Sequence, residues 1–384
     1  MGLNETFLQT AAAAAADNFD VKAYTGDAIT SPATTSQTIA TEFQWDMIFF
    51  KSRDGGFGNI CDTLRNQTDY TIVGGSVIAT QSSNAETTGS SVIAYATLKD
   101  TTNTSVGSQA YIWDNSAGNY GGNANGVDYI SYFFKGGGYP TAIMDGITIT
   151  PAIGAKMVDG ASDTTNWATT SDGQYPFSQT VNSVSKFSIT HQQKTTGSGP
   201  PYQPLEIPHS LGVIPEFVIL KIINDAADWQ IYHVASGKEW YMSTNIGGGT
   251  NNATSNVNTF STVDSDLIIN LQTGAVKEFI CYAWASVDGV SHFGSYAGSG
   301  TSASVTFGGT DPFTPSLLIV KSYSGTSTTD WVVIDSVRGA NEQLYLNNTD
   351  AYVASSGWSF DADGFTPAGD WDASGTNYLY CAWA

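Results

Sequence analysis

The sequence predicts an all-β protein, and three observations point to this class. Gly occurs 40 times among many Ser, Thr and Asn residues, a composition typical of short strands joined by tight turns. Apolar residues make up 41% of the 384-residue chain and aromatic residues 12%, enough to build a buried core. Lys and Arg together number only 14, and long helices would require more of them.

The charge of the chain excludes several classes of partner. The formal net charge is −21, so the surface repels phosphate backbones and anionic lipid headgroups, and we expect no nucleic-acid and no membrane partner. No stretch approaches the roughly 18 apolar residues that span a bilayer. The three cysteines, Cys61, Cys281 and Cys381, are far apart in the sequence and suggest buried thiols rather than a disulfide framework.

The first 17 residues are expected to form a short helix. An alanine run at 11–16 follows Asn4 as a possible N-cap and Glu5 in the first turn. An isolated helix of this length is marginal in water. We therefore expect residues 1–17 to be an anchoring segment that is ordered when it docks.

The remainder of the chain contains one pattern three times. The third copy reads PSLLIVK (315–321), DWVVIDSVRGA (330–340), LYLNNT (344–349), FDADGF (360–365) and YLYCAWA (378–384). The second reads PEFVILK (215–221), DWQIYHVASGK (228–238), WYMSTN (240–245), STVDSDL (261–267) and FICYAWA (279–285). The first is more degraded: WDMIFFK (45–51), CDTLRN (61–66) and YISYFFK (129–135). The repeat predicts three β units, at residues 18–137, 187–290 and 291–384.

Each unit is expected to be a β-sandwich or jelly-roll-like module. It opens with a strand (19–27, 186–192 or 292–300), and its continuous apolar runs are typical of central strands. In the third unit the Asp-Gly turn of FDADGF predicts a hairpin. About 100 residues per unit suits a sandwich, and a β-propeller-like arrangement is the second choice. Residues 138–186 are expected to be an insertion or linker that contains a strand pair at IMDGITIT.

As an ordered set, these motifs resemble a family of uncharacterised repeat domains in virion proteins of marine bacteriophages. The resemblance covers about residues 187–384 well and residues 18–135 loosely, and it excludes the insertion and the first 17 residues. It implies a tail, tail-fibre or other virion structural protein, located in the virion, on the tail rather than the head. Since the family has no established catalytic residue, the resemblance implies no catalytic site and no cofactor.

Polar motif residues are predicted to serve folding rather than chemistry. Asp62 and Arg65 correspond to Asp335 and Arg338, three residues apart after a strand, where a local ion pair can satisfy loop backbone groups. The middle unit has His233 and Ser236 at these positions. Because one unit dispenses with the pair, a structural role is the better interpretation.

Metal binding is the weaker interpretation of the densest acidic cluster. Asp361, Asp363, Asp370 and Asp372 could supply oxygen ligands to Ca²⁺, but the EF-hand spacing is absent. The four histidines have no metal-ligand spacing, and no GxSxG or P-loop motif occurs. We therefore expect no metal, and a non-enzymatic protein.

If the protein binds a receptor, exposed aromatic side chains are the best candidates, because sugar rings stack on them. The candidates for binding are Trp113, Trp167, Tyr202, Tyr352 and Trp358, with Tyr120 and Tyr175 in similar loops. The alternative for each is a small satellite core under a long loop.

These inferences lead to one functional hypothesis with two alternatives. The hypothesis is a tail-associated fibre or receptor-binding component that contacts other virion proteins, assembles as a homo-oligomer and recognises a host-surface glycan or envelope protein. The alternatives are a capsid decoration or cement protein and, more distantly, a polysaccharide depolymerase, which needs two opposed carboxylates.

Overall fold

The fold was analysed in a computed structural model of the 384-residue chain. The structure describes residues 18–27, 37–56, 58–65, 78–80, 109–112, 122–138, 142–144, 147–149, 156–163, 177–194, 205–237, 240–241, 251–252, 260–270, 277–325 and 329–384. These residues confirm the all-β class: the helical segment among them is a single 3₁₀ turn, η2 (Gly369–Asp372). The helix expected at residues 1–17 lies outside the described part.

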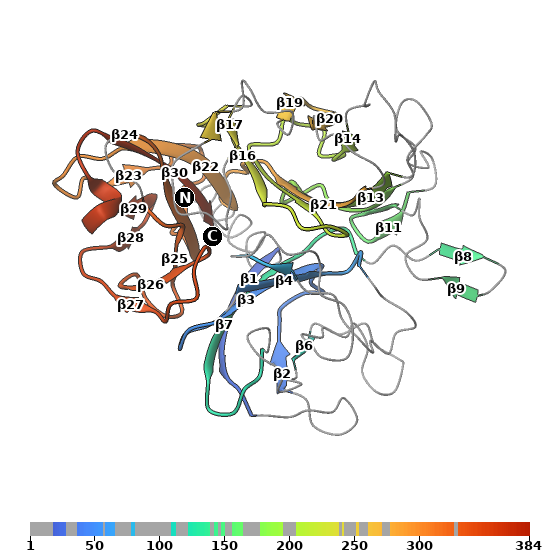
Figure 1. Ribbon diagram of the computed structural model, residues 1–384, viewed down its shortest axis with the longest axis horizontal. Helices are drawn as coiled ribbons and strands as arrows, with labels where there is room; N and C mark the ends of the chain where they lie inside the picture. Colours follow the sequence, from blue (N-terminus) through green and yellow to red (C-terminus); the bar gives the residue numbers. More distant parts are fainter. Residues whose placement is uncertain are drawn as a thin grey trace, which may run out of the picture.

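Three principal sheets organise the molecule (Figure 1). The first has the strand order β1 (Phe19–Thr25), β7 (Asp128–Phe134), β3 (Met47–Ser52), β4 (Gly58–Asp62), β5 (Ile78–Ala79). The second has the order β11 (Ala161–Ser162), β10 (Lys156–Val158), β12 (Phe177–Asn182), β13 (Phe187–Lys194), β21 (Lys277–Trp284), β15 (Phe217–Ile222), β16 (Gln230–His233). The third has the order β22 (Ser291–Ala297), β30 (Thr376–Trp383), β24 (Leu317–Gly325), β25 (Val332–Asp335), β26 (Glu342–Tyr345), β27 (Val353–Ala354).

Smaller sheets accompany the principal ones. They are β2 (Gln37–Ala40) with β6 (Gln109–Ile112); β14 (Leu205–Pro208), β20 (Leu267–Asn270) and β19 (Phe260–Val263); and β23 (Val305–Thr306), β29 (Gly364–Thr366) and β28 (Ser359–Asp361). Two further pairs are β17 (Trp240–Tyr241) with β18 (Asn251–Asn252) and β8 (Ala142–Met144) with β9 (Ile147–Ile149). The hairpin predicted at FDADGF is β28–β29, and the strand pair predicted at IMDGITIT is β8–β9.

The three principal sheets share one four-strand pattern in the same register. In each sheet the opening strand pairs with the closing strand of the unit. The closing strand also pairs with the strand that contains the apolar run and its lysine, and that strand pairs in turn with the strand that ends at the aspartate or histidine. The pairs Met47↔Asp62, Phe217↔His233 and Leu317↔Asp335 occupy corresponding positions. The sequence repeat is therefore a structural repeat, and we call residues 18–137, 187–290 and 291–384 units 1, 2 and 3.

Alternation along the strands gives each principal sheet two buried faces. In β15, Val218 and Leu220 pack into a core made within unit 2, together with residues of the small sheet β14–β20–β19. The intervening residues Phe217 and Ile219 face the other way, into a core that all three units share. β3 and β24 divide their side chains in the same manner, which is why all six residues of β3 and β15 are buried.

The shared core has approximate threefold symmetry. Phe134, Trp284 and Trp383 occupy the same register position in the three closing strands. Their ring centroids are 5.8, 5.5 and 6.0 Å apart in the three pairings. The three units thus surround one axis, and in Figure 1 the blue-green, yellow-green and orange-red sheets meet at the centre of the molecule.

The sequence did not predict how the three units pack together. One face of each principal sheet packs within its own unit, as in a sandwich, and the other face packs against the other two units instead of facing solvent. One boundary also differs: β10–β12 lie in the predicted insertion 138–186 but extend the sheet of unit 2, where β12 pairs with β13. The sequence predicts a linker there because the long polar stretches around these short strands weaken the hydrophobic pattern that would indicate them.

Candidate functional site

The repeated polar residues meet at the junctions between units. Tyr282 of unit 2 donates a hydrogen bond from its Oη to Oδ2 of Asp62 in unit 1 over 2.6 Å. The same Oδ2 accepts Nε of Arg65 at 2.6 Å, and both ion-pair side chains are essentially inaccessible to solvent. Asp62 Oδ1 accepts the backbone N–H of Leu64, and Arg65 also donates to the carbonyl of Ile60. The charges are therefore compensated within the junction, as burial requires.

A second junction repeats this arrangement between units 1 and 3. Tyr132 donates to Oδ2 of Asp335 over 2.8 Å, and Arg338 Nε donates to the same oxygen over 2.5 Å. Arg338 further donates to the carbonyl oxygens of Glu342 and Val333. Burial raises the pKa of both tyrosines, Tyr132 and Tyr282, well above the usual value, so both stay protonated donors at neutral pH.

The third junction, between units 2 and 3, uses different residues in the same places. Cys381 occupies the register position of Tyr132 and Tyr282, because it lies two residues before Trp383. His233 occupies the position of the aspartates, and its Nε2 lies 3.1 Å from the carbonyl oxygen of Tyr380 in unit 3. The backbone N–H of Ala235 donates to Nδ1 at 3.1 Å, which leaves the ring proton on Nε2 for that carbonyl.

His233 is held neutral at this junction. Burial lowers the pKa of its imidazole from 6.5 to about 4. Two of the three junctions are therefore ionic and one is neutral, and each connects a closing strand to the last residue of the fourth strand in the neighbouring unit. The contacts run in one direction: unit 2 to unit 1, unit 1 to unit 3, and unit 3 to unit 2.

Sequence reasoning found the Asp–Arg pairs but missed their tyrosine partners. The signal was present, since one of the positions at which FICYAWA and YLYCAWA differ has Tyr282 in one and Cys381 in the other, and the aspartate is replaced by His233 in a different unit. Without knowledge of which unit faces which, these two replacements could not be connected.

Each unit also buries the lysine that ends its apolar run. Lys51, Lys221 and Lys321 donate from Nζ to carbonyl oxygens of the following loop, Gly56, Ala227 and Thr329. Lys51 in addition reaches the carbonyl of Asn348 in unit 3 over 2.8 Å. Burial lowers the pKa of all three ammonium groups from 10.5 to about 8. The lysines hold loop backbones in place.

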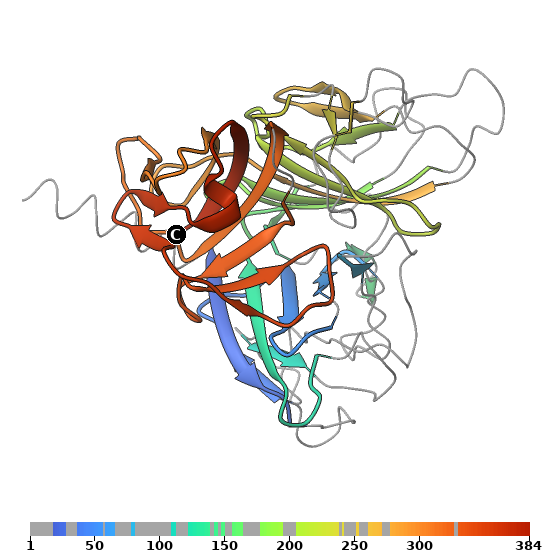
Figure 2. The same cartoon turned by 60° about the vertical axis from the view of Figure 1, so that its left-hand side comes forward.

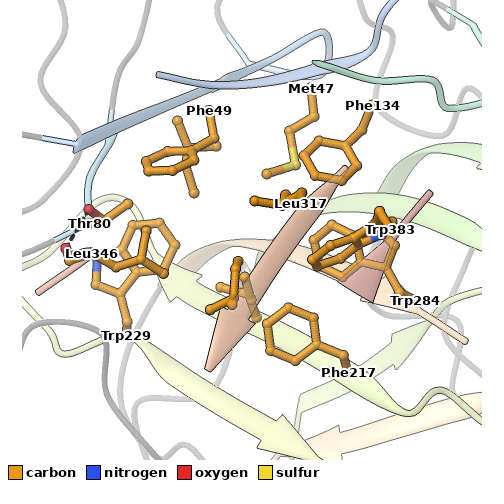
Figure 3. Close-up of a pocket in the computed structure, with 13 residues that line it drawn as sticks. Met47, Phe49, Thr80, Phe134, Phe217, Trp229, Trp284, Leu317, Leu346 and Trp383 are labelled. Carbon is orange, nitrogen blue, oxygen red and sulfur yellow. Dashed lines mark hydrogen bonds between the residues drawn. The ribbon is translucent and has the colours of Figure 1, made fainter. Parts of the chain in front are cut away.

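A cavity of about 40 Å³ lies in the shared core (Figure 3). All three units contribute to its wall; the corresponding residues Phe49, Ile219 and Ile319 line it together with Met47, Ile60, Thr80, Phe134, Phe217, Trp229, Trp284, Leu317, Leu346 and Trp383. No ionisable side chain is among them. The cavity can hold a small apolar group, and the hydroxyl of Thr80 in its wall is bonded to the carbonyl oxygen of Leu346.

The cavity coincides with a break in the threefold pattern. Four residues before His233 and Asp335 stand Trp229 and Trp331, whereas Gly58 stands four residues before Asp62. Trp229 donates from its indole N–H to the carbonyl of Ala79 in unit 1 over 3.0 Å. At Gly58 a Cβ atom would lie 2.7 Å from Thr80 Oγ1, so a larger residue does not fit there.

The four candidate calcium ligands do not form a metal site. Asp361 accepts hydrogen bonds from Ser359 on its own strand and from Thr366 across the hairpin, and Asp372 accepts backbone N–H groups of Ser299 and Ser302. In the described residues no group of three or more His, Cys, Asp or Glu side chains could hold a metal ion.

The aromatic candidates have different outcomes. Trp358 is only 4% exposed and packs against Phe365 and Trp371 in the core of unit 3, so the expectation of an exposed ring is wrong. Tyr352 is 41% exposed, as a contact residue must be. The candidates Trp113, Trp167 and Tyr202, like Tyr120 and Tyr175, lie outside the described residues.

Fold and junctions together define an all-β protein in which three repeated units share one core and polar contacts join each pair of units. A family model described as a domain of unknown function, DUF7483, matches residues 160–384, more than half of the chain. The chain belongs to this family. No curated protein and no solved structure matches the chain. Within the described residues, no helix is long and apolar enough to cross a membrane.

Proposed function

We propose that this chain is a non-enzymatic structural protein of a bacteriophage virion, associated with the tail, that contacts a host-surface molecule through loops on its β scaffold. The resemblance of its repeated motifs to virion repeat domains supports the proposal. Its net charge of −21 suits a protein whose partners are neither nucleic acids nor anionic lipids.

One observation carries the non-enzymatic part. The polar residues that recur in the repeat are used to join units: Asp62 and Asp335 are buried, accept tyrosine hydroxyls and are neutralised by arginines. A carboxylate that acts on a substrate has to reach it, and these two cannot. The shared core thus serves as a rigid support, and recognition falls to exposed connecting segments.

The location in the virion is the first test. Virions separated into heads and tails are probed with an antibody against this chain, and we expect the label on tails. Label on heads would favour the alternative of capsid decoration, and absence from the particle would contradict both.

Adsorption is the second test. Purified chain is incubated with host cells, and we expect it to bind and to slow phage adsorption at saturating concentration. A protein that neither binds nor competes is no receptor-binding component. Release of reducing sugar from host polysaccharide would instead indicate a depolymerase.

A further inference from the structure

An exposed aromatic surface lies where units 1 and 3 meet. Tyr352 belongs to a run of exposed residues, 349–354, that leads into and includes β27 at the edge of the third sheet. Val353 beside it is 44% exposed. In Figure 2 this part of unit 3 lies next to the blue and green strands of unit 1. The surface therefore involves two units.

The position of Tyr352 is fixed by the turn between β3 and β4. Its backbone N–H donates to the carbonyl oxygen of Arg53 over 2.8 Å, and Gly56 N–H donates to the carbonyl of Thr349 over 2.8 Å. The guanidinium carbon of Arg53 lies over the tyrosine ring, 5.4 Å from its centroid. An aromatic ring held in this way loses little conformational freedom when a ligand stacks on it.

The arginine that lies over the ring also contacts two carboxylates. Arg53 Nη2 donates to Oε2 of Glu342 over 2.7 Å, and its Nη1 lies 3.8 Å from Oδ2 of Asp128. Both carboxylates remain partly accessible, with side-chain exposures of 26% and 46%. Asp54 and Asp350 nearby are exposed as well. The surface combines a stacking ring with carboxylate acceptors, as carbohydrate sites do.

The charge of this surface selects among ligands. Glu342, Asp128, Asp54 and Asp350 outnumber the two cations of this region. Arg53 shares its charge with Glu342 and Asp128, and Lys51 is buried with its Nζ on the carbonyl oxygens of Gly56 and Asn348. An anionic sugar would be repelled here, and the whole chain adds to the repulsion. A neutral pyranose presents C–H faces to an aromatic ring and hydroxyl donors to carboxylates, so it matches both features.

We propose that the surface formed by Tyr352, Arg53, Glu342 and Asp128 binds a neutral, hydroxyl-rich glycan. The proposal rests on the proposed function and names the chemistry of the receptor. Tyr352 contributes stacking, Glu342 and Asp128 accept sugar hydroxyls, and Arg53 positions all three.

The test uses the purified full chain and an immobilised array of neutral and anionic oligosaccharides, with dissociation constants measured for the best ligand. We expect binding to neutral glycans with little dependence on salt. Tyr352→Ala should weaken it at least about tenfold, while Tyr352→Phe, which keeps the ring face, should stay within about threefold. Ile214→Ala is the matched control, since Ile214 is an exposed apolar residue of unit 2 (55%) away from this surface. Thermal melting of each variant verifies its fold.

Several outcomes would overturn the inference. They are no neutral glycan bound by the wild type, preference for anionic glycans, or equal binding by wild type and Tyr352→Ala. Cell adsorption separates the inference from the proposed function. If the wild type and Tyr352→Ala adsorb to cells equally, the receptor-binding surface lies elsewhere, which contradicts the inference but not the proposed function. If the wild type does not adsorb, the proposed function itself fails. Adsorption that survives periodate oxidation of the cells but not protease treatment would indicate a protein receptor and also contradict the glycan.

Discussion

Tyr282 Oη and Asp62 Oδ2 lie 2.6 Å apart although 220 residues separate them in the sequence. The contact joins two units: the tyrosine hydroxyl of the second unit completes the hydrogen bonding of the Asp62–Arg65 ion pair in the first. The stability of the shared core therefore depends on polar contacts that no single unit contains.

Removal of one tyrosine hydroxyl tests this dependence. Tyr282→Phe keeps the ring but takes a donor from a buried carboxylate, so the free energy of unfolding should fall by about 1–3 kcal/mol. Urea titration at neutral pH measures the change. Tyr132→Phe should behave alike, whereas Tyr352→Phe, at an exposed position, should stay within about 0.5 kcal/mol. Equal effects of all three substitutions would contradict the assignment.

Converting an ionic junction into the neutral type tests the correspondence between junctions. Arg338→Ser alone leaves the buried Asp335 without its ion-pair partner and should lower the free energy of unfolding by about 3–5 kcal/mol. Combined with Asp335→His and Tyr132→Cys, it reproduces the residue set that units 2 and 3 already use. The triple variant should lose less stability than the three single variants together, by at least about 2 kcal/mol. Additive losses would show that the three sets are not interchangeable.

The neutral junction should respond to acid. In the folded chain the pKa of His233 is about 4, below the ordinary 6.5, so between these values the unfolded chain binds a proton that the folded chain does not. Stability from this group is complete above pH 6.5 and is lost as the pH falls towards 4, by roughly 3 kcal/mol. Burial of Asp46 raises its pKa to about 6 and acts in the opposite direction.

Comparison with His233→Gln isolates the histidine. The glutamine amide can still donate to the carbonyl of Tyr380 but does not titrate. Urea midpoints at pH 7.5 and 4.5 should diverge more for the wild type than for the variant, because Asp46 contributes equally to both. Parallel pH profiles would show that His233 does not control the junction.

The cavity in the shared core offers a gain in stability. Ile219 lines it at the position where unit 1 has Phe49, so Ile219→Phe places a larger ring towards free space. We expect a rise of about 0.5–2 kcal/mol in the free energy of unfolding, measured by urea titration and thermal melting. Val218→Phe, one residue away but directed into the packed core of unit 2, should instead cost about 1–3 kcal/mol. A loss of stability in Ile219→Phe would mean that the cavity wall cannot rearrange.

The sequence was sufficient for the all-β class and for the repeated motifs, whose strands have the same register in the three principal sheets, because alternation and repeated motifs are local signals. It predicted a structural role for Asp62, Arg65, Asp335 and Arg338, because the middle unit has other residues at these positions. It could not assign Tyr132 and Tyr282 as their partners, because contacts between units depend on how sheets pack. The sequence predicts Trp358 at the surface because it falls in a loop away from the predicted strands; the core that covers it includes Phe365 and Trp371, several residues further along the chain.

Phe19, where the first unit begins, stacks on Trp383, where the third unit ends, with ring centroids 6.3 Å apart. The ring of units is thus closed by contact although the peptide chain is not closed. The packing of the three units therefore does not depend on which two neighbouring units the peptide chain leaves unconnected. A permuted gene that joins residue 384 to residue 18 through a short linker and opens between residues 286 and 290 would encode the same three junctions in a new order.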